Sequence, residues 1–466
     1  MATRIMYPHA TKEYLVQQFV GKSLKDVPTP SAVLDLNKLK ANCNRMLEAV
    51  DVLKIGWRAH IKTHKTTELT RLQVGEGSSP ANIIVSTLIE GEEILPLLLG
   101  YKEKGRAANV LYSFPVTPAA VNRLSAIAKA IGAGGLCLMV DHPDQLAAVK
   151  AIKEQSGVAP LIFLKIDMGG RRAGVAPQSA VAADLISKLL ALDTEGSCVL
   201  HGLYSHAGQS YSSSDRSQAL DFLRQEFEAL LVTAEMVHST SARKALVLSV
   251  GATPTTTSIR NLLIESEARP AEESKAISAL KGTLEAIRAI GCSLEIHAGV
   301  YPTLDVQQLA THALPTTGPD AMLTWDDLAF TILGEVASLY PGRGPGGKSE
   351  ALVGAGGIAL GREPCKAYSG WGILSPWNRA NASLPTTGPE QHAGWQVGRL
   401  SQEHGILSWA GEEKDVEPLE VGQKVRIWPN HACIAGVGFS WYLVVDSSLE
   451  GKEDEVIDVW PRWRGW

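Results

Sequence analysis

The sequence predicts an α/β fold, with a (β/α)8 TIM-type barrel followed by a second, mostly β C-terminal domain. Eight short apolar runs occupy the first two thirds of the chain, and amphipathic stretches such as 118–131, 144–154 and 179–192 separate most of them. After about residue 318, glycine and proline become more frequent, helical periodicity fades and short β-like runs appear. An open doubly wound sheet is the alternative, but eight regular repeats favour a closed barrel.

The barrel strands are expected at the eight apolar runs, which are 58–62, 83–86, 110–112, 136–140, 161–166, 199–204, 246–250 and 294–297. In the β domain we expect strands at 328–340, 351–359, 424–427 and 436–445. The chain of 466 residues is too long for one average domain. We expect residues 1–45 to pack with the C-terminal domain, 46–318 to form the barrel and 319–466 to form the β-rich domain. The charged, Ala-rich segment 258–285 lengthens one barrel connection and should be helical and peripheral; its role stays open.

Composition argues against several classes of protein. The net charge is −5, and acidic and basic residues are interspersed, so no basic stripe suggests a nucleic-acid partner. No apolar run approaches the ~18 residues that a membrane span needs, and the first residues lack an apolar signal core. The six cysteines have no framework spacing and suggest reduced thiols. These features predict a cytoplasmic protein with no membrane contact.

The stretch Arg58-Ala-His-Ile-Lys-Thr-His-Lys is the most informative part of the sequence. Read as a strand, its alternation places Arg58, His60, Lys62 and His64 on one face, and Lys65 on the other face or past the strand. Barrel enzymes place their chemistry at the carboxyl ends of the strands. A lysine that forms a Schiff base must be partly neutral, and neighbouring cations favour the neutral amine. The pattern therefore selects Lys62 as the candidate catalytic residue; an exposed basic edge is the alternative.

Several later strand ends carry residues suited to an anion or a flat ring. Small and hydroxyl residues at 249–255 allow backbone N–H groups to approach a phosphate, and 295–301 follows the last strand with a glycine at its turn. Barrels often bind phosphate with the loops after strands seven and eight. In 167–175, Arg171 or Arg172 could pair with a phosphate or carboxylate. Each segment alone is also compatible with an ordinary turn. The candidate binding residues are Arg172, Tyr204, His206, Gln209, Tyr211, Ser249, Gly251, Thr253, Gly299, Val300 and Tyr301.

A candidate metal site lies in the second domain, at Pro429-Asn-His-Ala-Cys433. On a strand, His431 and Cys433 would share a face with their Cα atoms ~6.6 Å apart. Zinc accepts both a histidine nitrogen and a cysteine sulfur. Two ligands are too few for a closed structural site and would leave positions for water or substrate, while a buried pair of unrelated residues is the alternative. Glu403 and His404 could support the metal or shape the pocket, and their spacing does not decide between these roles.

Together these motifs resemble the eukaryotic D-serine dehydratase family, on the alanine racemase-like, type III fold of pyridoxal phosphate enzymes. The family pattern around the lysine is Arg-Pro-His-x-Lys-Thr-His-Lys, and here Ala59 replaces the proline. The family's Pro-Asn-His-x-Cys zinc motif is intact at 429–433, and the resemblance covers nearly the whole chain.

The resemblance implies a role for several residues. Lys62 is then the Schiff-base residue, and His431 and Cys433 bind zinc. It also implies that Tyr204 and Tyr211 contact pyridoxal 5′-phosphate, and that Thr253 and the backbone at 299–300 bind its phosphate. The family usually has asparagine at position 300, so Val300 retains only its N–H. Similar enzymes are dimers whose active site draws on the second domain, which implies a homodimer here.

The expected activity is a pyridoxal phosphate- and zinc-dependent dehydratase, an ammonia-lyase that converts D-serine to pyruvate and ammonia. D-Threonine and D-threo-3-hydroxyaspartate are alternative small D-amino acid substrates. A D-threonine aldolase on the same fold would use an oxygen-ligand metal, and the Cys433 thiolate argues against it. A racemase needs a second base, and a non-enzymatic carrier of pyridoxal phosphate would lack the metal domain. The fold alone does not choose among these activities.

Overall fold

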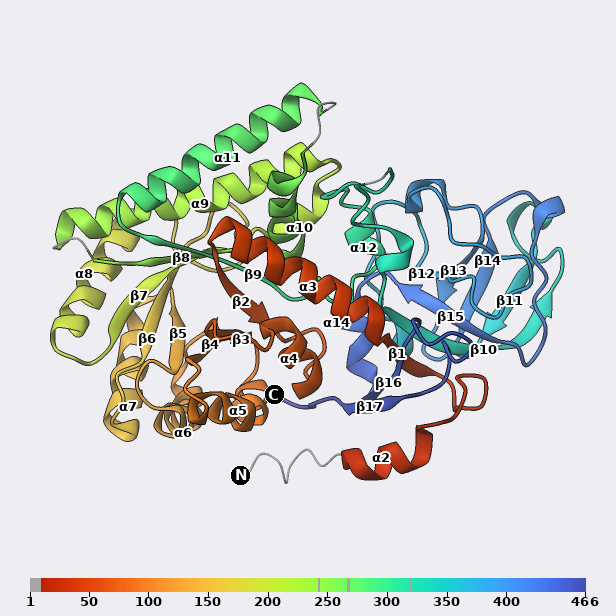
Figure 1. Cartoon of the computed structure of the whole chain (residues 1–466), viewed down its shortest axis with the longest axis horizontal. Helices are drawn as coiled ribbons and strands as arrows, with labels where there is room; N and C mark the ends of the chain where they lie inside the picture. Colours follow the sequence, from red (N-terminus) through yellow and green to blue (C-terminus); the bar gives the residue numbers. More distant parts are fainter. Residues whose placement is uncertain (1–9, 242–243, 266–268, 319) are drawn as a thin grey trace. The chain divides into compact units, whose positions relative to one another are not determined.

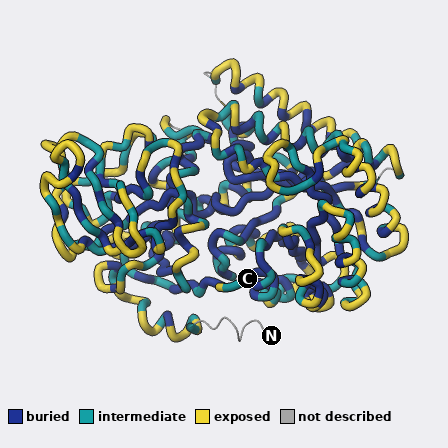
Figure 2. The backbone as a smooth tube through the Cα atoms, turned by 180° about the vertical axis from the view of Figure 1, so that it is seen from behind, coloured by how far each residue is buried: buried dark blue, intermediate teal, exposed yellow. Residues whose placement is uncertain are grey.

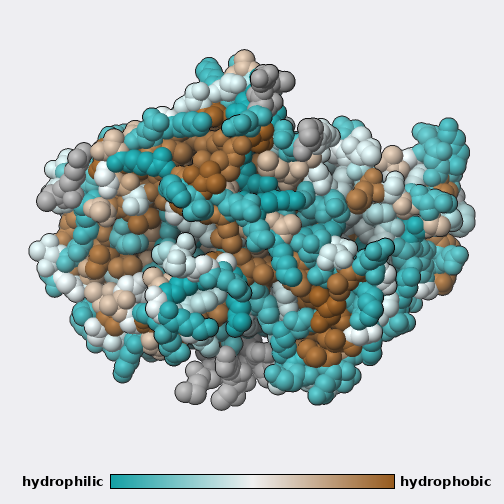
Figure 3. Space-filling view, viewed as in Figure 1, coloured by the Kyte–Doolittle hydropathy of each residue, from teal (hydrophilic) through white to brown (hydrophobic). Residues whose placement is uncertain are grey.

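A computed structural model describes residues 10–241, 244–265, 269–318 and 320–466. The described residues divide into two compact units. The barrel unit comprises the described residues of Arg45–Gly299 and Gly465–Trp466, and the β unit comprises those of Met1–Asn44 and Val300–Arg464. No described helix is both long enough and apolar enough to cross a membrane. On the face drawn in Figure 3, hydrophilic residues are interspersed with smaller apolar patches.

The barrel unit is a closed parallel barrel in which the last strand pairs with the first, as predicted. Its strands, drawn in Figure 1, are β2 (Gly56–His60), β3 (Ala81–Val85), β4 (Ala108–Pro115), β5 (Leu136–Val140), β6 (Leu161–Lys165), β7 (Val199–Tyr204), β8 (Val247–Val250) and β9 (Ser293–Ala298). All carboxyl ends therefore meet at one end of the barrel, so residues that follow different strands can contribute to one site.

Helices surround the barrel and bury one side against it. They are α4 (Thr67–Val74), α5 (Leu88–Glu103), α6 (Val121–Ile131), α7 (Leu146–Ser156), α8 (Ala180–Thr194), α9 (Arg216–Thr240), α10 (Thr253–Ser258) and α11 (Ala271–Ala289). Side chains of Thr66, Ser179 and Asp215 cap α4, α8 and α9 by accepting a backbone N–H in the first turn. In Figure 2 the long outer helices are exposed along their outer sides, and the segments between them are buried.

The segment 258–285, apart from residues 266–268, which lie outside the described residues, is mostly helical and forms the connection between β8 and β9. It contains the 3-10 turn Ile259–Leu263 and most of α11, which lies beside α9 in Figure 1. The helix α11 buries Ile277, Leu280 and Leu284. The prediction of a helical, peripheral segment is confirmed for its described residues, and this apolar stripe makes α11 one of the outer helices of the barrel.

Charged and polar side chains fill the barrel interior toward the amino ends of the strands. Arg58 is 1% exposed, and its Nε donates to Glu295 Oε1 at 2.7 Å. Its Nη1 donates to Asn109 Oδ1 at 2.6 Å, and its guanidinium lies 5.3 Å from the ring centroid of Phe163. A buried charge is tolerable only when it is paired and hydrogen-bonded, which is the case here.

The β unit is a mixed sheet with the strand order β11-β14-β13-β12-β15-β10-β1-β16-β17. Its strands are β1 (Ser31–Asp35), β10 (Phe330–Tyr340), β11 (Glu350–Val353), β12 (Gly372–Leu374), β13 (Trp395–Leu400), β14 (Gly405–Trp409), β15 (Lys424–Pro429), β16 (Trp441–Val445) and β17 (Asp458–Pro461). The N-terminal strand β1 lies between β10 and β16. Further helices of the chain are α2 (Lys12–Phe19), α3 (Leu36–Leu53), α12 (Val306–Leu309), α13 (Gly357–Leu360) and α14 (Ala432–Ala435).

Three boundaries in the β unit differ from the sequence-based expectation. The β unit begins at Val300 rather than at residue 319, because Leu304, Val306 and Leu309 pack in one apolar cluster with Ile373 and Trp428. The expected strands 351–359 and 436–445 are shorter than predicted. Helical turns occupy Gly357–Leu360 and Gly436–Gly438, so β11 ends before the first and β16 begins after the second.

Candidate active site

Lys62 lies in a turn just beyond the carboxyl end of β2. The strand ends at His60, and the N–H of Lys65 donates to the carbonyl of Ile61 at 2.9 Å, which closes a helical turn. Alternation therefore applies only to Arg58 and His60. The prediction that Lys62 and His64 share their strand face is wrong, because the chain leaves the sheet in order to start α4.

His64 is buried apart from the catalytic candidates. It is 1% exposed, its Nδ1 lies 3.0 Å from Thr66 Oγ1 and its Nε2 lies 2.9 Å from Gln73 Oε1. Both partners belong to the cap and the body of α4. His64 therefore fixes the turn that carries Lys62.

A cavity of about 290 Å³ lies at the carboxyl end of the barrel, next to this turn. It brings together the predicted residues Lys62, Arg172, Tyr204 and His206, which follow or end three different strands. The complete lining is His60, Lys62, Ser86, Ser113, Phe114, Pro115, Met139, Lys165, Arg172, Ala173, Tyr204 and His206. Three of these side chains are cationic and none is a carboxylate, so the cavity suits an anionic ligand. Within the described residues, Lys62 Nζ makes neither a hydrogen bond nor an ion pair.

The loop after β6 decides between the two adjacent arginines. Arg172 lines the cavity. Arg171 is exposed and has a positive φ of 51°, and its backbone N–H donates to Asp167 Oδ1 at 3.0 Å. Asp167 also accepts the N–H of Gly169 at 2.9 Å. Asp167 thus holds the loop backbone rather than a guanidinium, and the loop presents Arg172 to the cavity.

Lys165, the last residue of β6, is a second lysine in the cavity that sequence reasoning missed. It is 6% exposed, and its Nζ lies 5.0 Å from the ring centroid of Tyr204. Burial, followed by the charge of Arg172, lowers the pKa of Lys165 to about 8. The sequence feature that could have identified Lys165 is a lysine near the end of the otherwise apolar run 161–166.

Neutral histidines surround these cations. Burial is the main reason that the pKa values of His60, His206 and His297 lie well below the usual histidine value, and nearby lysines and arginines lower them further. The Tyr204 and His297 rings are stacked, with centroids 4.3 Å apart and an interplanar angle of 12°. His297 Nε2 is buried and has no hydrogen-bond partner among the described residues.

The loops after β7 and β8 are held by a carboxylate from α9. Glu226 Oε1 accepts the N–H of Ala207 at 2.7 Å and that of Gly251 at 3.2 Å, and the Thr255 hydroxyl donates to Oε2 at 2.9 Å. Burial raises the pKa of Glu226 to about 7. The N–H of Gly251, predicted to face a phosphate, is therefore donated to Glu226. Its carbonyl lies 2.6 Å from His206 Nδ1.

Other predicted residues lie around the cavity without lining it. Ser249 Oγ is buried 3.1 Å from His297 Nδ1. Gln209 and Tyr211 belong to the 3-10 turn Gly208–Ser212, where Gln209 Nε2 donates to Met168 Sδ at 2.7 Å. Gln209 Oε1 is buried and has no hydrogen-bond partner within the described ranges.

The remaining predicted phosphate contacts fall on both units. Thr253 is the first residue of α10 and is 3% exposed. A Cβ on Gly299 would lie 3.2 Å from the carbonyl oxygen of His60, so a close backbone approach requires glycine there. Val300 and Tyr301 belong to the β unit, in which Tyr301 Oη lies 4.0 Å from Cys43 Sγ.

The predicted metal ligands lie in a turn of the β unit, not on a strand. β15 ends at Pro429, and α14 begins at Ala432. Asp305 Oδ2 accepts the Ala432 N–H at 2.9 Å, and Asn430 Nδ2 donates to the carbonyls of Glu363 and Gly370, so tertiary contacts bend the chain here. The expectation of a shared strand face is therefore wrong.

The two side chains nevertheless meet. His431 is hydrogen-bonded to Cys433, and its Nδ1 lies 3.6 Å from Glu363 Oε2. Burial lowers the pKa of His431, but the hydrogen bond and the charges of Cys433, Asp305 and Glu363 outweigh burial and raise the pKa to about 9. This anionic surrounding favours a cation.

The described ranges contain no group of three or more His, Cys, Asp and Glu side chains arranged to hold a metal ion. The described part of the chain thus offers zinc the pair His431 and Cys433, which has suitable donor chemistry but supplies two ligands only. Glu403 and His404 are exposed in the turn between β13 and β14.

Two protein-family models match the chain. The model of a putative serine dehydratase domain matches residues 329–445, and the model of the alanine racemase N-terminal domain matches residues 34–270. The chain is 37% identical to the D-serine dehydratase of Schizosaccharomyces pombe, over 99% of this chain and 97% of that protein. It is 32% identical to the D-serine dehydratase of Saccharomyces cerevisiae, over 97% of this chain and 99% of that protein.

A solved structure has the same fold. D-threo-3-hydroxyaspartate dehydratase from Delftia sp. HT23 superposes with a TM-score of 0.69 at 25% identity, covering 96% of this chain and 100% of that one. The likeness thus extends over both units rather than the barrel alone.

Proposed function

Because the chain belongs to the D-serine dehydratase family, on the alanine racemase-like fold of pyridoxal phosphate enzymes, we propose that it converts D-serine to pyruvate and ammonia with pyridoxal phosphate and zinc. The observation that carries the proposal is the meeting of Lys62 with Arg172, Tyr204 and His206 in one cavity at the carboxyl end of the barrel. The reaction removes water from Cα and Cβ of the amino acid, and hydrolysis of the enamine then releases pyruvate and ammonia.

The cavity fits pyridoxal phosphate. Lys62 supplies an amine that has no ion-pair partner among the described residues, and Arg172 and Lys165 supply positive charge for a phosphate or carboxylate. Tyr204 and His297 supply parallel ring planes, and the polar atoms of His297 Nε2 and Gln209 Oε1 lack partners in the described part of the chain. When bound, the cofactor supplies an electron sink for the carbanion that forms at Cα.

The side chains of this chain then have distinct tasks. Lys62 Nζ would hold the cofactor, and its amine would also serve as the base that removes the proton from Cα of the substrate. Arg172 binds an anionic group, and the neutral His60 and His206 add hydrogen-bonding capacity without competing positive charge. Glu226 fixes the two loops that follow β7 and β8.

The pair His431 and Cys433 is the proposed zinc site. Hydroxide is a poor leaving group, and zinc supplies a Lewis acid for the departing β-oxygen. A thiolate and an imidazole suit zinc better than manganese or magnesium, and the carboxylates of Glu363 and Asp305 add favourable charge. The sequence resemblance also implies a homodimer, which light scattering of the purified protein tests.

The decisive experiment pairs the two lysines of the cavity. Purified wild type should form pyruvate and ammonia from D-serine and show the visible absorbance of a lysine-bound cofactor. Lys62→Ala should lose both, whereas Lys165→Ala should keep the absorbance. An absorbance that persists in Lys62→Ala and disappears in Lys165→Ala would overturn the assignment. Products from L-serine and D-threonine are measured in parallel, since glycine and an aldehyde would indicate an aldolase and L-serine formed from D-serine a racemase.

A second candidate substrate is D-threo-3-hydroxyaspartate. The chain is 28% identical to the D-threo-3-hydroxyaspartate dehydratase of Delftia sp. over 95% of its length. The cavity contains three cations and no carboxylate, which also fits a substrate with a second carboxylate. Comparing kcat/KM for this compound and for D-serine decides between the two, and a higher value for the hydroxyaspartate would displace D-serine as the preferred substrate.

A further inference from the structure

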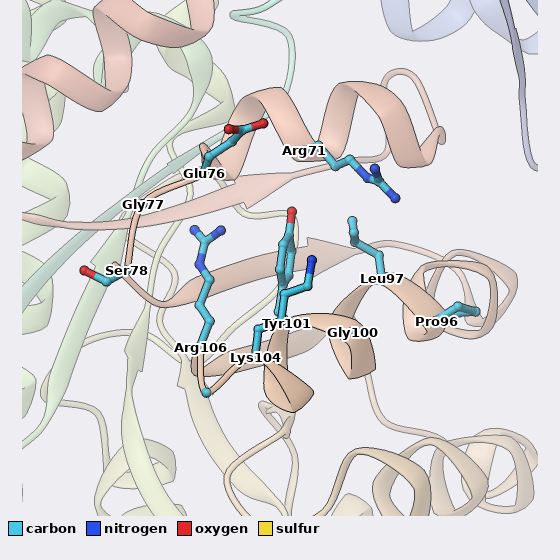
Figure 4. A pocket seen from close by; sticks show the side chains of 11 residues that line it. Arg71, Glu76, Gly77, Ser78, Pro96, Leu97, Gly100, Tyr101, Lys104 and Arg106 are labelled. Atoms are coloured by element: carbon cyan, nitrogen blue, oxygen red, sulfur yellow. The ribbon is translucent and has the colours of Figure 1, made fainter.

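A hollow of about 660 Å³ lies at the amino-terminal end of the barrel, opposite the end that carries Lys62. It is formed by the C-terminal parts of α4 and α5 and by the loops 75–80 and 104–107, which lead into β3 and β4 (Figure 4). Its lining is Arg71, Glu76, Gly77, Ser78, Pro96, Leu97, Gly100, Tyr101, Lys104, Gly105 and Arg106. It shares no residue with the cavity at Lys62, and its size is typical of a small-molecule site.

The charge of the hollow is positive in a chain whose net charge is −5. Three cations face one carboxylate, that of Glu76. Arg106 is 9% exposed and donates to the carbonyl oxygens of Ser79, Gly75 and Val74 at 2.6–2.7 Å. Its hydrogen-bond partners are neutral, and no carboxylate among the described residues forms an ion pair with this buried charge. With three cations and one carboxylate, the hollow has a net positive charge that attracts an anion.

Arg71 and Lys104 are the exposed cations at the hollow. Neither side chain makes a hydrogen bond or an ion pair with any residue in the described ranges. In Figure 4 the Arg71 side chain comes from α4 and its guanidinium lies near Leu97, whereas the Lys104 amine lies beside the Tyr101 ring. A guanidinium and an ammonium group that line the same hollow can both bind the oxygens of a phosphate.

One wall of the hollow is apolar and aromatic. The Tyr101 ring stacks on the Arg106 guanidinium, with the guanidinium carbon 4.7 Å from the ring centroid, and Leu97 and Pro96 continue the wall. Burial raises the pKa of Tyr101, so its hydroxyl stays protonated and can donate a hydrogen bond. This wall suits a flat ring next to the anionic group.

Glycines leave the hollow open. A Cβ built on Gly77, Gly100 or Gly105 would have no atom within 4 Å. Gly100 lies on α5, where a larger side chain has an ordinary helical backbone to occupy. A side chain at this position would therefore fill the hollow without displacing its neighbours.

We propose that this hollow binds a small organic phosphate of mononucleotide size, with the phosphate held by Arg71 and Lys104 and the flat ring placed on Tyr101 and Leu97. The cations account for the phosphate, and the aromatic wall and the volume of about 660 Å³ account for the ring. The site is separate from the cavity at Lys62, so the ligand does not compete with D-serine for space.

Isothermal titration of the holoenzyme with adenosine 5′-monophosphate tests the proposal. We expect one site per chain, an affinity that weakens with added salt, and weaker binding of inorganic phosphate alone and of adenosine alone. Arg71→Ala should weaken binding about tenfold or more, because a charge-assisted hydrogen bond is lost. Gly100→Leu should abolish binding while improving the local helix propensity.

Two matched variants serve as controls. Lys129→Ala removes an exposed cation elsewhere, and Gly282→Leu adds a side chain to a helical glycine of α11 that also has no atom within 4 Å of its Cβ. Both should bind adenosine 5′-monophosphate as the wild type does. Absence of binding at about 1 mM, or binding unchanged in Gly100→Leu, would overturn the proposal. Equal affinity for phosphate alone would overturn the ring contact, and equal affinity for adenosine would overturn the phosphate contact.

Discussion

The cavity at Lys62 and the turn at His431 both contain buried or half-buried histidines, but their surroundings have opposite charge. In the barrel unit, burial and neighbouring lysines and arginines lower the pKa values of His60 and His206. In the β unit, Cys433 and two carboxylates overcome burial and raise the pKa of His431 to about 9. Burial acts alike in both places, so the sign of the neighbouring charges decides the protonation state.

The difference assigns the two regions to different ligands. A cavity lined by cations and neutral bases suits a substrate carboxylate and a phosphate, whereas an imidazole beside a thiol and carboxylates suits a metal cation. Proton removal and stabilisation of the leaving group are thus expected to depend on residues that can be altered separately.

The largest effect on activity should come from removing a ligand of the proposed zinc site. Cys433→Ser should lower kcat/KM for D-serine by about 100-fold or more, because the loss of a Lewis acid costs several kcal/mol. The visible absorbance of the cofactor should remain, and zinc content measured by mass spectrometry should fall. Cys365→Ala, which alters a buried cysteine of the same unit, is the control and should keep its zinc. Full activity in a metal-free sample would remove the metal from the mechanism.

Substitution of the two adjacent arginines tests the binding of an anionic group in the cavity at Lys62. Arg172→Ala should weaken the binding of D-serine or of the cofactor about 10- to 100-fold, because Arg172 lines the cavity and a charged hydrogen bond is lost. Arg171→Ala should change either affinity less than about twofold, because Arg171 does not line the cavity. The KM for D-serine and the dissociation constant of the cofactor are the measurements. A larger effect at Arg171 would reverse the assignment.

A smaller effect concerns the carboxylate that holds the loops of the cavity. Burial raises the pKa of Glu226 from about 4.5 to about 7, so its contribution to stability is present below pH 4.5 and is lost as the pH rises through 7. From pH 5 to pH 8, the wild type should lose about 1–3 kcal/mol of unfolding free energy relative to Glu226→Gln, which mimics the protonated form. Urea denaturation at several pH values measures the difference, with the exposed Glu235→Gln on α9 as control. If the free energy of unfolding depended on pH in the same way for wild type and Glu226→Gln, the expected titration of Glu226 would be contradicted.

The smallest effect is expected at the polar turn between β13 and β14. Glu403→Ala and His404→Ala should each change zinc content and kcat/KM by less than about twofold, because both residues are exposed. Loss of zinc in either variant would add a ligand to the pair His431 and Cys433. The proposed metal site would then extend from His431 and Cys433 to the turn between β13 and β14.

The sequence allowed the barrel and the meeting of its strand ends to be predicted, because apolar runs mark buried strands and the carboxyl ends of parallel strands lie together. Arg172, Tyr204 and His206 were placed in this way. The predicted alternation of faces failed at Ile61, where a hydrogen bond within a turn ends the strand. It failed again after Pro429, where the chain turns and the Ala432 N–H donates to Asp305. Such contacts involve residues distant in sequence or a local competition between helix and strand, and a periodic pattern reports neither.

Buried polar residues were the hardest to predict. Glu226 lies in the middle of a long amphipathic helix, where a glutamate is normally exposed, and only the folded chain shows its three hydrogen bonds. Lys165 ends an apolar run in which alternation gave no reason to select it. Glu226 is buried where two loops and Thr255 donate hydrogen bonds to it, and Lys165 is buried against the Tyr204 ring. Both environments are properties of the tertiary structure.

The paired Arg58 and Glu295 have a consequence for the movement of small molecules. With Phe163 and Asn109 they fill the barrel interior toward the amino ends of the strands, and each of the four is less than a tenth exposed. The barrel therefore provides no through passage, and substrate and product use the same entrance. Pyruvate and ammonia must diffuse out before the next D-serine can enter, so accumulated pyruvate is expected to inhibit by competing with the substrate.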